Sequence, residues 1–86
     1  MVNNRPPGPF LPAPAQLRAA RAALGLSVEA CAKQSGLGVN TIRRAEAGGL
    51  EAVTGANAAR LVETLERLGV TFLAADEQGP GLRFRA

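Results

Sequence analysis

Hydrophobic residues in the first half of the chain recur every three or four positions, the spacing of one face of an α-helix. A first helix is predicted from Pro14 to about Leu24, because proline suits the first helical position and Gly25 would end the run. An arginine on its otherwise apolar stripe requires a partner, and Glu46 is the obvious candidate. The stripe consists of Leu17, Ala20, Arg21 and Leu24.

Residues 27–46, with the sequence SVEACAKQSGLGVNTIRRAE, predict two short helices joined by a tight turn. The hydroxyl of Ser27 can cap the first helix, and Gly36 can adopt the positive φ that ends it. A second helix restarts at Val39 and has one apolar and one polar face. An amide and two guanidinium groups on the polar face suit the major groove of DNA. The inner face is expected to hold Ile42, Ala45 and Glu46, and the outer face Asn40, Arg43 and Arg44.

The second half of the chain predicts one more helix and then a change of period. After a loop at residues 47–53, Thr54 can cap a helix that runs to about Leu68. Two short β-prone runs at residues 70–74 and 82–85 then flank the turn-rich sequence ADEQGPG. This arrangement predicts a β-hairpin at the C-terminal end of the sequence.

The predicted hairpin, together with the helix that precedes it, is a candidate dimerisation element. A two-stranded ribbon alone is only marginally stable, and its edges can pair with a strand of a second copy. A two-fold dimer would place two recognition helices about 34 Å apart, one turn of DNA. The alternative is that the hairpin packs on the last helix of its own chain and completes the core. The residues expected at the dimer contact are Val70, Phe72, Leu82 and Phe84.

The segment from Pro14 to Gly48 resembles the lambda-repressor-like, or Xre-type, helix-turn-helix family of bacterial and phage regulators. The family pattern is roughly R-x-x-x-G-L-S-Q-x-x-L-A-x-x-x-G-V-S-x-x-T-I-x-x-x-E, and the chain follows it in register without a gap. The resemblance implies a mainly α fold with a four-helix domain, here followed by the C-terminal β-hairpin. It also implies that Arg21 pairs with Glu46. The matching positions are Arg21, Gly25, Leu26, Ser27, Ala32, Gly36, Leu37, Thr41, Ile42 and Glu46.

Three positions depart from the family pattern. Val28 stands where the family often has a glutamine that contacts DNA, and Cys31 replaces the core leucine. Gly38 replaces the serine or threonine that usually caps the recognition helix, although glycine is an acceptable cap. These departures affect the expected sequence readout more than the expected fold.

Residues 1–13 contain four prolines, which remove hydrogen-bond donors and oppose helix formation. They predict a flexible proline-rich arm, whose Arg5 could reach along DNA; a simple leader is the alternative. The chain is therefore divided into this arm, a helix-turn-helix DNA-binding domain at residues 14–68, and the hairpin tail at residues 69–86.

The positive charge lies mainly in the first half of the chain. Residues 1–50 carry six Lys and Arg against two acids, whereas residues 51–86 carry four Arg against five acids. A protein that binds DNA phosphates needs such a positive surface near its binding helices. This imbalance alone is ordinary for an arginine-rich protein, so the motif carries more weight.

Composition argues against several other classes of protein. The chain has no histidine and one cysteine, so neither a disulfide nor a Cys/His metal site is expected within one chain. We expect no catalytic residues and no cofactor, and Cys31 is interpreted as an inert core thiol. No apolar run has the length of a membrane span or a signal peptide core, which favours a cytoplasmic protein.

The leading hypothesis is a sequence-specific DNA-binding regulator, most simply a repressor that binds double-stranded DNA as a homodimer. In the expected interface Asn40 contacts adenine, Arg44 contacts guanine and Val39 touches a thymine methyl. Phosphates are expected to contact the side chains of Lys33, Thr41 and Arg43 and the backbone amides at Ser27 and Val28.

The alternative hypothesis is a protein-binding module, such as an antitoxin or antiactivator, that uses the same fold to bind another protein. Val28 favours this alternative. A protein that no longer binds DNA would be expected to lose the polar residue that contacts DNA at this position.

Overall fold

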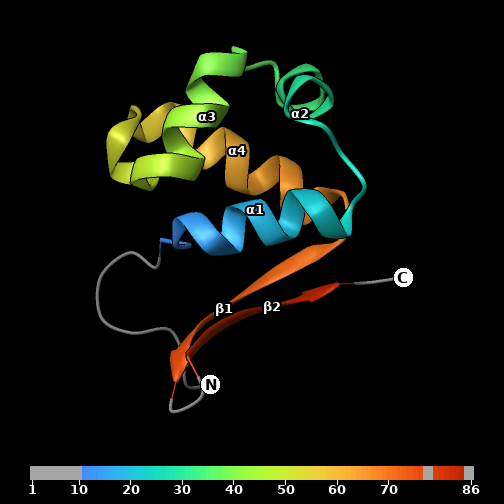
Figure 1. Ribbon diagram of the computed structural model, residues 1–86, viewed down its shortest axis with the longest axis vertical. Helices are drawn as coiled ribbons and strands as arrows, with labels where there is room; N and C mark the ends of the chain where they lie inside the picture. The colour runs from blue at the N-terminus through green and yellow to red at the C-terminus, as the bar shows by residue number, and fades with distance from the viewer. Residues whose placement is uncertain (1–10, 77–78, 85–86) are drawn as a thin grey trace.

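The computed structural model describes residues 11–76 and 79–84 and shows a mainly helical chain followed by a β-hairpin (Figure 1). This confirms the predicted fold class. Most of the predicted arm, including Arg5, lies outside the described residues. In the described part of the chain, no helix is long and apolar enough to cross a membrane. The elements are α1 (Pro14–Ala23), α2 (Val28–Ser35), α3 (Val39–Gly48), the 3-10 turn η1 (Leu50–Ala52), α4 (Gly55–Arg67), β1 (Val70–Asp76) and β2 (Gly79–Phe84).

Local sequence explains where the helices begin and end. The Oγ of Ser27 accepts a hydrogen bond from the Ala30 amide at 2.9 Å, which caps α2. The Oγ1 of Thr54 caps α4 by accepting from the amide of Asn57 at 3.1 Å. Gly36 ends α2 with a φ of 74°, a conformation that favours glycine. These caps agree with the sequence predictions.

The prediction of a loop at residues 47–53 is partly wrong. The helix α3 continues through Gly48, and residues 50–52 form the 3-10 turn η1. Leu50 explains the difference, because only 2% of it is exposed and its burial in the core holds the segment in a helical turn. The glycine between the two elements, Gly49, has a φ of 87° that a side chain would strain.

The core lies between the helices and one face of the hairpin. Figure 1 shows α1 in the middle, with α3 and α4 on one side and the hairpin on the other. Among the described residues, the inner positions predicted for α3 are all buried. The buried hydrophobic residues are Leu17, Ala20, Cys31, Ala32, Ile42, Ala45, Leu50, Ala58, Leu61, Leu65, Val70 and Phe72.

The hairpin packs on its own chain, with β1 against α4 and β2 against α1. In its antiparallel register Val70 faces Phe84 and Phe72 faces Leu82, so these four side chains share one face. The dimer contact proposed from the sequence therefore needs correction. Val70 and Phe72 are only 2% and 8% exposed within the monomer, because they complete the core that the helices leave open. Leu82 is partly buried against the same core, and Phe84 remains 46% exposed.

One buried glutamine fastens the hairpin to α1. The Nε2 of Gln16 donates to the carbonyl oxygens of Leu73 at 2.9 Å and Gly81 at 2.7 Å. Its Oε1 accepts from the amide of Ala13 at 2.8 Å, which gives the N-cap residue of α1 a hydrogen-bond partner. Gln16 is 5% exposed, so its side chain is shielded from water although the bonds it makes are only partly buried. This side chain joins both strands to α1.

Candidate nucleic-acid interface

The helix α3 has one buried face and one exposed face. Ile42, Ala45 and Glu46 are buried, which fixes the rotation of the helix about its axis. Asn40, Arg43 and Arg44 are exposed on the other side, as the sequence predicted. An outward face with one amide and two guanidinium groups presents the donors and acceptors that base edges in a major groove can pair with.

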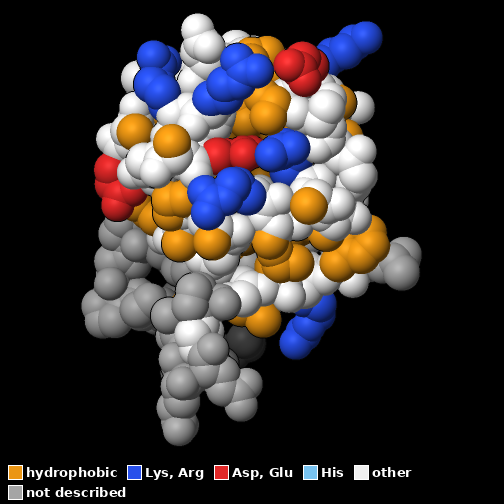
Figure 2. Space-filling view, in the orientation of Figure 1, with side chains coloured by type: hydrophobic (Ala, Val, Ile, Leu, Met, Phe, Trp, Pro, Cys, Tyr) orange, Lys and Arg blue, Asp and Glu red, His pale blue; other side chains and the backbone are white. Residues whose placement is uncertain are grey.

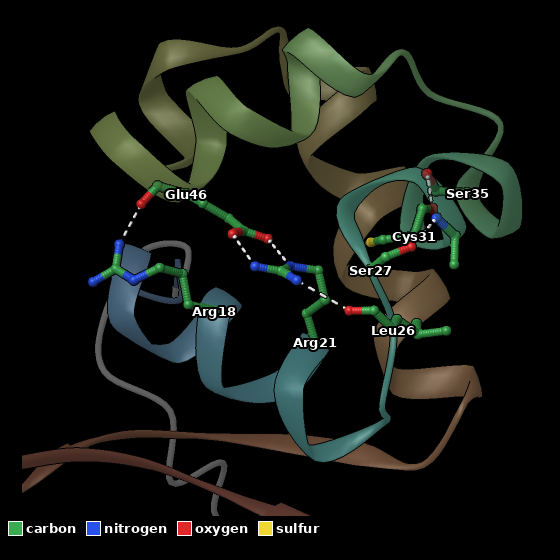
Figure 3. Close-up of polar contacts among 8 residues, drawn as sticks. Arg18, Arg21, Leu26, Ser27, Cys31, Ser35 and Glu46 are labelled. Atoms are coloured by element: carbon green, nitrogen blue, oxygen red, sulfur yellow. Dashed lines mark hydrogen bonds and ion pairs between the residues drawn. The ribbon is translucent and has the colours of Figure 1, made fainter.

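An ion pair joins α1 to α3 (Figure 3). The Nε of Arg21 donates to Glu46 Oε2 at 2.7 Å, and its Nη2 donates to Glu46 Oε1 at 3.0 Å. A third bond, 3.0 Å long, runs from the same guanidinium to the carbonyl oxygen of Leu26. The hydrogen bond with Glu46 raises the pKa of Arg21, against a smaller opposing effect of burial. The pair therefore fixes α3 to α1 and to the corner that leads into α2.

A second ion pair joins α2 to α3 on the exposed surface. Arg43 lies 3.7 Å from the carboxylate of Glu29, and both side chains are more than half exposed. Such a pair is screened by water and contributes little to stability. Arg43 is therefore free to exchange this partner for another anion at little cost.

The remaining predicted contact residues lie on α2, including its N-cap, and in the first turn of α3. Ser27 and Lys33 are exposed, and Thr41 is half-buried. Val28 and Val39 are the first residues of their helices, and each packs partly against the core. The amides in the first turn of α2 have no carbonyl partner within the helix, so they can bind an anion. The amide of Ala30 is the exception, because it already donates to the hydroxyl of Ser27.

Arg18 is a contact that the sequence analysis did not single out. One of its guanidinium nitrogens donates to the backbone carbonyl oxygen of Glu46 (Figure 3). Arg18 precedes Arg21 by three positions, so both side chains leave the same face of α1. The spacing from Arg21 indicates that Arg18 points toward α3. The sequence could not show that its partner is the backbone carbonyl of Glu46.

Cationic side chains gather on the side of the molecule formed by α1 and α3. Figure 2 shows Lys and Arg side chains over these helices, with a few acidic side chains between them. The carboxylate of Glu46 is paired with Arg21, and the cations of these helices outnumber their acids, so this side carries a net positive charge. The cations of α1, α2 and α3 are Arg18, Arg21, Lys33, Arg43 and Arg44, and the acids are Glu29 and Glu46.

The single cysteine is part of the core. Cys31 is 1% exposed, and this burial raises the pKa of its thiol, which leaves it a poor nucleophile. Across residues 11–76 and 79–84, no three His, Cys, Asp or Glu side chains are grouped so as to hold a metal ion.

Comparison with known proteins agrees with this geometry. A family model described as helix-turn-helix matches residues 17–73, more than half of the chain. The match begins within α1 and ends within β1, so it includes all of α2, α3 and α4. A comparison with curated proteins finds no match.

Proposed function

Because the chain belongs to the lambda-repressor-like helix-turn-helix family of DNA-binding regulators, we propose that it is a sequence-specific repressor that reads the major groove with α3. The observation that carries the proposal is the outer face of α3. Its amide and guanidinium groups are exposed while its inner face is fixed by the core and by the Arg21–Glu46 pair. A helix held in this way can present its side chains to DNA with little loss of conformational freedom.

In the proposed interface base edges and phosphates are bound by different residues. Asn40 pairs with adenine, Arg44 with guanine, and Val39 contacts a thymine methyl. Arg43 exchanges Glu29 for a phosphate, and Lys33 and Thr41 bind other phosphates. The N-terminus of α2, at Ser27 and Val28, presents backbone amides to the DNA backbone.

The two classes of contact predict different effects of substitution. Asn40→Ala and Arg44→Ala should each remove about 1–3 kcal/mol of discrimination between a selected duplex and a scrambled one. Lys33→Ala should weaken binding to both duplexes by the same factor, since a phosphate contact carries no sequence information. Fluorescence anisotropy on both duplexes at fixed salt measures these effects.

The control for this experiment is Arg83→Ala, which removes an exposed cation from the hairpin. It should leave discrimination unchanged. If the Asn40/Arg44 double variant still distinguishes the two duplexes as well as the wild type does, then α3 is not the reading element.

We further propose that the regulator works as a two-fold homodimer. One short recognition helix reads only a few base pairs, whereas two helices about 34 Å apart read two successive major grooves. Since Val70 and Phe72 are buried in the monomer, the apolar side chain left exposed on their face of the hairpin is Phe84, which is 46% exposed. Phe84 and the free edge of β2 beside it are the proposed contact.

Light scattering tests the dimer proposal. The full chain should be a dimer at micromolar concentration, and Phe84→Ser should shift it toward the monomer without unfolding it. Leu11→Ser is the matched control, because Leu11 is 45% exposed and lies outside the hairpin. A wild-type chain that remains monomeric under these conditions would refute the proposal.

A protein-binding module is the second candidate function, and an apolar groove favours it. The groove lies between η1 and α4, has a volume of about 410 Å³, and is lined mainly by Leu11, Leu50, Val53, Ala58 and Val62. Failure of the full chain to enrich any duplex from a random pool would favour this function over the proposed repressor.

A further inference from the structure

The α1 helix directs two arginines at the same residue of α3, and the two are used differently. Arg21 binds the carboxylate of Glu46, so its charge is neutralised by its partner. Arg18 binds only the backbone carbonyl oxygen of Glu46, and no acidic side chain among the described residues pairs with it. Arg18 is exposed and retains its full positive charge at the surface.

The carbonyl that Arg18 binds lies in the last turn of the proposed recognition helix. The last four carbonyl oxygens of a helix have no partner within it, and α3 ends at Gly48, so the oxygen of Glu46 belongs to this set. A cation there also interacts favourably with the negative end of the helix dipole. Arg18 therefore acts as a cap that α1 supplies to α3.

This bond leaves most of the guanidinium unused. An arginine has five N–H donors in a planar group, and the carbonyl of Glu46 occupies one terminal nitrogen of Arg18. The bond restrains the side chain beside the exposed C-terminal part of α3, where Ala47 and Gly48 carry no polar side chain. The remaining donors are thus held beside the C-terminal end of α3 (Figure 3).

We propose that Arg18 binds a phosphate of the DNA backbone beside the C-terminal end of α3, while its bond to Glu46 holds it in place. This inference rests on the proposed DNA-binding function. It adds a phosphate contact from α1, which lies outside the two helices of the helix-turn-helix. The hydrogen bond from Arg18 to the carbonyl of Glu46 connects this contact to the recognition helix. Because a phosphate carries no sequence information, Arg18 contributes affinity and register and leaves base preference unchanged.

The salt dependence of binding by the full chain tests this proposal. Each phosphate contact contributes about 0.9 to the slope of log affinity against log salt on duplex DNA. Arg18→Gln should lower that slope by about 0.9, so that raising salt from about 50 to about 200 mM weakens the wild type about three- to fourfold more than the variant. The ratio of affinities for a selected and a scrambled duplex should stay the same.

Two further variants separate a phosphate contact from a structural cap. Arg18→Lys keeps the charge and should keep the wild-type slope. Arg67→Gln removes a cation from the last turn of α4 and should leave the slope unchanged. Thermal melts of each variant verify folding, and glutamine at position 18 retains a donor for the carbonyl of Glu46.

Duplexes in which one phosphate at a time is replaced by an uncharged methylphosphonate locate the contact. One replacement should weaken the wild type several-fold and have no effect on Arg18→Gln, because the two changes remove the same interaction. If Arg18→Gln keeps the wild-type slope and no replacement distinguishes it from the wild type, Arg18 is only a cap. If the wild type itself binds no duplex at any salt, the proposed function fails and this inference fails with it.

Discussion

Replacing Glu46 with alanine is expected to lower the free energy of unfolding by about 3 kcal/mol. The Glu46 side chain is 10% exposed and that of Arg21 is 22% exposed, so the substitution leaves a partly buried guanidinium without its carboxylate. Two hydrogen bonds are lost, and only the bond from Arg21 to the Leu26 carbonyl remains. Urea unfolding followed by circular dichroism measures the loss.

Two comparisons show whether burial is the cause. Adding Arg21→Leu to Glu46→Ala should recover part of the loss, because no unpaired charge then remains in the site. Glu29→Ala breaks the exposed pair with Arg43 and should cost less than about 1 kcal/mol. If Glu46→Ala were as mild as Glu29→Ala, the pair between α1 and α3 would not stabilise the fold.

The second large effect is expected from Gln16→Glu, which changes one atom of the side chain that joins the hairpin to α1. A carboxylate can still accept from the Ala13 amide but cannot donate to the carbonyl oxygens of Leu73 and Gly81. Two partly buried acceptors then lose their donor at about 1–3 kcal/mol each, and a negative charge faces them. The free energy of unfolding should fall by about 3 kcal/mol or more.

Hydrogen exchange shows where Gln16→Glu acts. Amide protection should fall in residues 70–76 and 79–84 before it falls in α2 and α3, because the hairpin loses its attachment first. Gln16→Met, which is similar in length and uncharged, should cause a smaller loss with the same distribution. Uniform loss of protection over the whole chain would show that the glutamine does not specifically hold the hairpin.

Local signals made most of the fold predictable from the sequence. Hydroxyl caps at Ser27 and Thr54, a glycine at the end of α2 and helical periodicity act over a few residues, and each appears where expected. The pairing of Arg21 with Glu46 was implied by the family resemblance, and the structure contains it. The outer face of α3 also followed from periodicity.

The features that the sequence did not reveal depend on contacts between distant segments. Gln16 bonds to Leu73, which lies 57 residues further along the chain, and to Gly81, which lies 65 residues further along. No local sequence pattern indicates that a glutamine has this role. The same holds for Arg18 and the carbonyl of Glu46. Alternation correctly placed Val70 and Phe72 on one face of the hairpin, but it could not indicate whether that face would meet a second copy or the helices of its own chain.

The central claim, that the exposed face of α3 reads DNA sequence, is tested most directly by one affinity ratio. Duplexes enriched by the full wild-type chain from a random pool are compared with scrambled duplexes of the same composition, in one buffer at physiological salt. Specific binding predicts that the enriched duplex binds at least about 10³-fold more tightly than the scrambled one. A ratio near one would contradict the claim, because binding would then depend on phosphate charge alone.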